Sequence, residues 1–124
     1  MHIQPPIPVL RSFDFEKAKA FYLDYLGFRL LFEHKFNDEA PLYIGITLGQ
    51  CVLHLTGHHS DACPGSLVRI AVEDVEGFCR SLSLKSYRYA NPSVIEQPWG
   101  YKELVVSDPS GNRLVFCTPI PQSI

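Results

Sequence analysis

The sequence predicts a single α+β domain built from two successive modules, and three observations lead to this prediction. The chain has 124 residues, enough for one hydrophobic core but too few for two independent ones. Its hydrophobic share of 46% and charged share of 19% are those of an ordinary globular protein. A short apolar run followed by a helix-capping Asp occurs twice, at Asp14 and at Asp74. We therefore expect one domain over residues 1–124, with module one at about 1–57 and module two at about 66–124.

Module one is expected to have the order β-α-β-β-β. Its first strand covers Ile7–Leu10 and follows prolines that cannot donate ladder hydrogen bonds. Asp14 is an N-cap for a helix whose apolar residues recur at helical spacing until Gly27. Three further strands are expected over residues 28–36, 42–48 and 51–55.

Module two repeats this order after a loop over residues 58–66. A strand over residues 67–72 leads to a helix that Asp74 caps and that runs through Phe78 and Leu82. Shorter strands are expected over residues 94–95, 104–106 and 114–117. Only the element order and the final strand recur, so the alternative is that the repeat is coincidental.

Charge and cysteine spacing exclude several classes of function. The net charge of −2 gives no reason to expect nucleic acid, which requires clustered Lys and Arg. No apolar run has the length of a membrane span, and the first residues lack the pattern of a signal peptide. We therefore expect a cytoplasmic protein. Its four cysteines lack metal-type spacing and are expected to be reduced thiols.

Two groups of residues resemble a known family. Ile7-Pro8-Val9-Leu10, Asp14, Phe21-Tyr22 and Leu26-Gly27-Phe28 resemble the opening of the glyoxalase, bleomycin-resistance and extradiol-dioxygenase superfamily. The stretch Glu96–Gly100 followed by Asp108–Asn112 is similar to its bleomycin-resistance branch in particular. The resemblance implies paired βαβββ modules that form a curved mixed sheet with a cleft. It also implies a homodimer whose N-terminal arm packs on the partner subunit.

The second of these motifs contains two kinds of turn. Asp108 and Gly111 are explained by turn chemistry, since Asp accepts local backbone hydrogen bonds and Gly tolerates positive φ. Trp99 is different, because it lies between Pro98 and Gly100 rather than in an apolar run. We predict that its indole is a rigid stacking wall for a small molecule. The alternative is that it anchors the core.

Enzymes of the resembled superfamily place His or Glu on four strands to hold a divalent ion. The matching positions here are Ile7, His54, Leu67 and Val115, of which only His54 has a donor atom. Because catalytic zinc-type centres use about three protein ligands, we expect no metal and no cofactor. The alternative is a metal-dependent lyase, isomerase or transferase with a non-standard site centred on His54, drawing on its neighbours His58, His59, Asp61 and Glu103.

The resemblance then implies a non-catalytic protein that binds and sequesters a bleomycin-type antibiotic and so confers resistance. We expect no catalytic residues and an aromatic or cationic ligand, bound by Trp99, Phe32, Phe36, Tyr43, Tyr101 and His54. Phe32 and Phe36, four positions apart, are expected to share one face of a strand, with core packing as the alternative. The chain is only slightly acidic, which leaves open another planar compound or an interaction module without a ligand.

Overall fold

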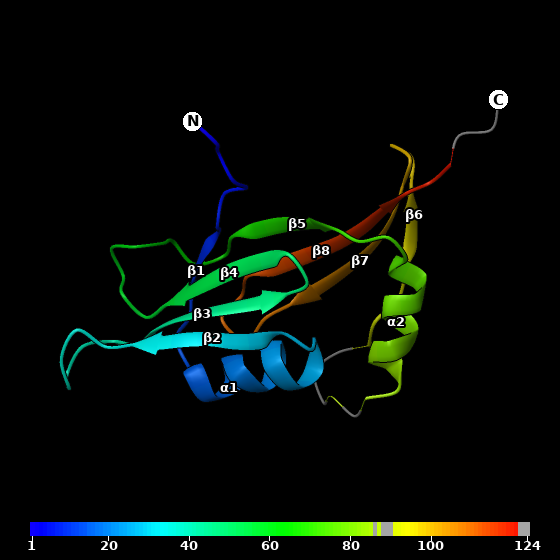
Figure 1. The fold of residues 1–124 in the computed structure, drawn as a ribbon. Helices are drawn as coiled ribbons and strands as arrows, with labels where there is room; N and C mark the ends of the chain where they lie inside the picture. The colour runs from blue at the N-terminus through cyan, green and yellow to red at the C-terminus, as the bar shows by residue number, and fades with distance from the viewer. Residues whose placement is uncertain (86, 88–90, 122–124) are drawn as a thin grey trace.

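The computed structural model describes residues 1–85, 87 and 91–121, so residues 86, 88–90 and 122–124 of the expected second module lie outside it. The chain forms two four-stranded mixed sheets, with strand orders β1-β4-β3-β2 and β5-β8-β7-β6 (Figure 1). The elements are β1 (Val9–Arg11), α1 (Phe15–Lys19), η1 (Ala20–Tyr25), β2 (Arg29–His34), β3 (Tyr43–Leu48), β4 (Cys51–Thr56), β5 (Leu67–Ala71), α2 (Val75–Ser83), β6 (Ile95–Gln97), β7 (Tyr101–Ser107) and β8 (Arg113–Pro119).

The predicted α+β class with repeated β-α-β-β-β order is confirmed. Each sheet contains one parallel pair, β1 with β4 and β5 with β8, and its remaining pairs are antiparallel. Within the described part of the chain, the two sheets are separate hydrogen-bonded units. The segment over residues 57–66 leads from the first to the second without a helix or strand, as expected.

The first helix departs from the expected uninterrupted α-helix. The Asp14 side chain accepts a hydrogen bond from the backbone N–H of Lys17, which starts α1, but the next six residues form the π-helix η1. Gly27 ends this segment at a φ of 90°. The backbone N–H of Phe28 then donates to the Tyr22 carbonyl at 2.8 Å, a helix end that requires a left-handed residue between them.

Strand lengths are set by their partners, and several of the expected bounds are wrong for this reason. The first strand starts at Val9 instead of Ile7, because Pro8 has no N–H to donate. β2 ends at His34, which pairs with the first residue of β3, Tyr43, so it does not extend to residue 36. β7 and β8 are longer than expected because each supplies the other with partners over seven residues.

The core lies between the helices and one face of each sheet. Phe21 and Tyr22 of η1 pack edge to face with ring centroids 4.9 Å apart, and Phe78 of α2 lies 4.7 Å from Phe116 of β8. Buried strand residues alternate with outward ones, as Leu53 and Leu55 do with His54. We call the side of each sheet that carries the alternate residues its helix-free face.

The Asp108–Asn112 turn joins the two modules. Buried Asp108 accepts the Tyr22 hydroxyl at 2.7 Å and both nitrogens of Asn112 at 2.9 Å. The Asn112 side chain in turn donates to the Arg11 carbonyl and accepts from the Ser66 N–H. The expected turn is therefore present, and it connects β1 and η1 of the first module with the start of the second.

No helix among the described residues combines the length and apolar character needed to cross a bilayer. The four cysteines are free thiols, and only Cys117 is buried.

Candidate functional site

The six predicted ligand-binding residues fall into two groups, one on the helix-free side of each sheet. We call the first the Tyr43 cluster, comprising Phe32, Phe36, Tyr43, His54 and His58. The second is the Trp99 cluster, comprising Arg69, Trp99, Tyr101 and Glu103.

The centre of the Tyr43 cluster is a hydrogen bond of 2.7 Å between the Tyr43 hydroxyl on β3 and Nδ1 of His54 on β4. The Phe32 ring stacks on Tyr43 at 6.2 Å with an interplanar angle of 13°, and meets His54 edge to face. Gly45 makes room for this ring, because a Cβ at that position would lie 2.3 Å from it. The packing of this aromatic surface therefore depends on a glycine at position 45, which has no side chain.

Burial determines the protonation states of Tyr43 and His54. It lowers the pKa of His54 and raises the pKa of Tyr43, which the Asp61 carboxylate raises further. At neutral pH the hydroxyl is thus protonated and the imidazole neutral. We assign the Tyr43 O–H as the donor and His54 Nδ1 as the acceptor, which leaves the ring proton on Nε2.

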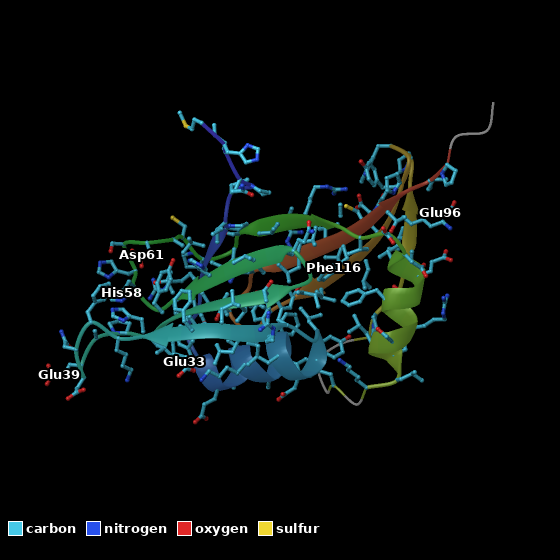
Figure 2. The ribbon with its side chains drawn as sticks, in the orientation of Figure 1. Glu33, Glu39, His58, Asp61, Glu96 and Phe116 are labelled. Carbon is cyan, nitrogen blue, oxygen red and sulfur yellow. The ribbon has the colours of Figure 1, made fainter. Side chains whose placement is uncertain are left out.

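A pocket of about 340 Å³ opens beside this pair, lined by Val9, Phe36, Tyr43, His58 and Asp61. Figure 2 shows His58 and Asp61 close together at one end of the molecule. Phe36 meets His58 edge to face at 5.7 Å. The expectation that Phe36 shares a strand face with Phe32 is wrong, because β2 ends before it; both rings nonetheless belong to the Tyr43 cluster.

The Trp99 cluster lies on the sheet with strand order β5-β8-β7-β6. The predicted turn is present: Gly100 has a φ of 91° and donates its N–H to the Gln97 carbonyl at 3.1 Å. Trp99 is 60% exposed, so the core-anchor alternative is wrong. Core packing is likewise wrong for Phe32 and Phe36, which are both exposed.

Glu103 organises the Trp99 cluster. Its carboxylate is 4% exposed and accepts the Trp99 indole N–H at 2.9 Å and the Arg69 guanidinium at 2.5 Å. Arg69 also lies 5.5 Å from the centre of the Tyr101 ring. The hydrogen bond from Arg69, reinforced by that from Trp99, holds the pKa of Glu103 below its ordinary value. Glu103 is therefore an ionised acceptor that orients the indole.

The two clusters occupy equivalent places in the repeat. Val9 pairs with His54 across β1 and β4 as Arg69 pairs with Val115 across β5 and β8. Tyr43 pairs with Thr56 as Glu103 pairs with Cys117. Val9 thus corresponds to Arg69, and Tyr43 to Glu103.

The residues at the family's metal positions do not fit a divalent ion. Ile7 and Leu67 are exposed hydrocarbons, and Val115 is a buried one. The remaining position, His54, has its Nδ1 bonded to Tyr43. Across the residues that the structure describes, no group of three or more His, Cys, Asp or Glu side chains is placed to hold a metal.

Four contributions are not predicted by the sequence analysis. Arg69 is given no role there, and His58, Asp61 and Glu103 are named only as possible neighbours of His54 in the alternative metal site. A sequence signal exists for Arg69 and Glu103: Arg69 is the only charged residue of β5, and Glu103 alternates with the apolar Leu104 of β7, so each is expected on the outward face of its own strand. Their pairing across β5, β8 and β7 requires the strand order, which the sequence alone does not provide.

A family model described as glyoxalase superfamily protein matches residues 1–121. The chain belongs to the glyoxalase superfamily. No match was found among curated proteins.

Solved structures with this superfamily fold include a bleomycin-binding protein and a bleomycin resistance determinant, which agrees with the predicted branch. One, from Streptomyces verticillus in complex with copper(II)-bleomycin, is 27% identical with a TM-score of 0.68, covering 98% of this chain and 99% of its own. The bleomycin resistance determinant of transposon Tn5 is 22% identical with a TM-score of 0.69, covering 94% and 98%. A glyoxalase-related enzyme from Clostridium phytofermentans is 17% identical with a TM-score of 0.76, covering 97% and 98%.

Proposed function

We propose that this glyoxalase-superfamily chain is a non-catalytic binding protein that sequesters a bleomycin-type antibiotic and thereby confers resistance. The proposal is supported by the aromatic clusters on the helix-free faces and by the hydrocarbon side chains at three of the four family metal positions. It is also supported by the likeness to a bleomycin-binding protein over 98% of the chain.

The observation that carries the proposal is the exposed but fixed indole of Trp99. An exposed Trp leaves a large apolar surface in water, which favours covering it with another molecule. Its N–H is bonded to buried Glu103, so the ring is already oriented before a guest arrives. Because the Trp99 side chain is already held in one orientation, it loses little conformational entropy when a ligand binds, which strengthens association.

Sequestration requires affinity and no chemical step. A micromolar dissociation constant corresponds to about 8 kcal/mol. Aromatic pairs contribute about 0.5–1.5 kcal/mol each beyond the area they bury. Several stacked rings, together with the buried area itself, therefore suffice to lower the free concentration of a planar guest.

The proposal includes a homodimer formed through the N-terminal arm. The arm extends away from the sheets (Figure 1) and carries exposed Ile3 and Ile7. In Figure 2, His58 and Asp61 lie at one end of the molecule and Glu96, close in sequence to Trp99, at the other. A second copy would allow the Tyr43 cluster of one chain to face the Trp99 cluster of the other. Sedimentation equilibrium should then give twice the 14.0 kDa of one chain, and deletion of residues 1–6 should reduce it.

The test is a calorimetric titration of bleomycin into the wild type and Trp99→Ala. We expect the substitution to weaken binding by at least about tenfold, which equals about 1.4 kcal/mol. Phe13→Ala is the matched control, because Phe13 is also 60% exposed but belongs to neither cluster. Equal affinity of all three proteins would refute the assignment of Trp99.

Metal analysis separates this proposal from the His54-centred enzyme. A stoichiometric divalent ion in the purified protein, with a melting temperature that falls when a chelator removes it, would contradict the non-catalytic assignment.

A further inference from the structure

The pocket of the Tyr43 cluster exists because of a difference between the two modules. In module two, the Arg69 side chain crosses the helix-free face and binds Glu103. The corresponding residue in module one is Val9, which is too short to cross that face and instead lines the pocket. Module one therefore has an opening where module two has a guanidinium group.

The lining of this opening suits a positive charge. The Asp61 carboxylate accepts the Thr56 hydroxyl at 2.6 Å, yet it takes part in none of the ion pairs found among the described residues. Aromatic rings of Phe36 and Tyr43 form two of the walls. A cation beside aromatic rings is attracted to their negative faces, and a hydrogen bond to a carboxylate adds to this attraction.

His58, which lines the pocket, has a polar atom without a partner: its Nε2 is buried and makes no hydrogen bond in the described part of the chain. A buried polar atom without a partner is unfavourable. With its proton on Nδ1, the imidazole would offer Nε2 as an acceptor beside the carboxylate once the ring turns toward a donor in the pocket.

From these three observations we infer that the pocket binds a guanidinium, amidinium or ammonium group of the guest, with Asp61 as its countercharge. Arg69 in module two is an internal example of the same arrangement, because its guanidinium also lies between a carboxylate and the Tyr101 ring. The inference rests on the proposed function, since it assigns one end of the same guest to this pocket.

The test uses benzamidine and benzamide, which have nearly the same shape and differ in charge. Calorimetry should show benzamidine binding the wild type at least about tenfold more tightly than benzamide. Asp61→Asn should remove that difference, because the amide has no charge to pair with the amidinium. Asp38→Asn is the control, since Asp38 is an exposed carboxylate in the turn after β2 that does not line the pocket.

A second variant tests whether a cationic side chain of the protein itself can occupy the pocket. Val9→Arg should place a guanidinium in the pocket as Arg69 does in module two, and benzamidine binding should be lost while the thermal melt stays cooperative. Should this variant fail to fold, Asp61→Asn decides alone. Equal binding of benzamidine and benzamide by the wild type, or unchanged benzamidine binding by Asp61→Asn, overturns the inference.

The bleomycin titration keeps the two proposals distinguishable. Bleomycin binding that depends on Trp99, together with charge-independent benzamidine binding, would overturn the cation pocket alone. Charge-selective benzamidine binding without bleomycin binding would support the pocket and overturn bleomycin as the guest.

Discussion

Glu103 accepts hydrogen bonds from Trp99 and Arg69 while being almost fully buried, so its charge governs the geometry of the Trp99 cluster. A buried carboxylate is stable only while its partners are in place. Trp99 is the only Trp of the chain, so its fluorescence reports on this single location.

The charge of Glu103 predicts how Trp99 emission depends on pH. The folded pKa of Glu103 lies below its ordinary value of 4.5, so the stabilisation it provides is complete above that value and is lost as the pH falls through the folded pKa. We expect Trp99 emission to stay constant from pH 7 to 4.5 and to change only below it. Glu103→Gln should abolish this transition, whereas Glu96→Gln on exposed β6 should retain it. A transition centred above 4.5 would contradict the Arg69–Glu103 pairing.

Single residues were predicted well where their neighbours in sequence define their role. Trp99 could be placed at the surface because Pro98 and Gly100 specify a turn. Asp61 could not be assigned to the pocket from sequence, because its position there depends on Val9, more than fifty residues earlier. Predicted ligand contacts of all six residues remain predictions.

Among the elements, β2 shows how local signals are overruled by pairing. Its residues 28–36 are apolar enough for a longer strand, but the strand ends where β3 no longer offers partners. The same pairing brings Phe32 opposite Gly45, at the register shift between Leu30 and Phe32. This contact could not be predicted, because a sequence does not show which residue a bulge skips.

The pairing of β2 and β3 predicts the effect of Gly45→Ala. The new Cβ would overlap the outer edge of the Phe32 ring, which lies on an exposed edge strand and can move. We expect the free energy of unfolding to change by less than about 1 kcal/mol, with loss of the nuclear Overhauser contacts between Phe32 and Tyr43. In a Phe32→Ala background, Gly45→Ala should leave the His54 resonances unchanged. Retained ring contacts in Gly45→Ala would contradict the described packing.

At the scale of the whole molecule, the Asp108–Asn112 turn determines how the modules are joined. The motif was expected to be a simple turn, and its local hydrogen bonds agree with that. The hydrogen bond between Tyr22 and Asp108 joins residues 86 positions apart, so no local sequence pattern predicts it.

Two neighbouring tyrosines test this connection. Tyr22→Phe removes a buried hydrogen bond to a carboxylate and should lower the free energy of unfolding by about 1–3 kcal/mol in urea denaturation. Tyr25→Phe is the control, because the buried Tyr25 hydroxyl has no hydrogen-bond partner among the described residues and its removal should cost nothing. Equal losses for both variants would indicate that the Tyr22–Asp108 bond adds no stability.

Separate placement of the two clusters has a practical consequence for redesign. Each sheet holds its aromatic group through contacts within its own module, Phe32 through Gly45 in one and Trp99 through Glu103 in the other. A mutant library that randomises Val9, Phe36 and His58 would thus leave the opposite wall intact. New recognition properties could be selected one half at a time.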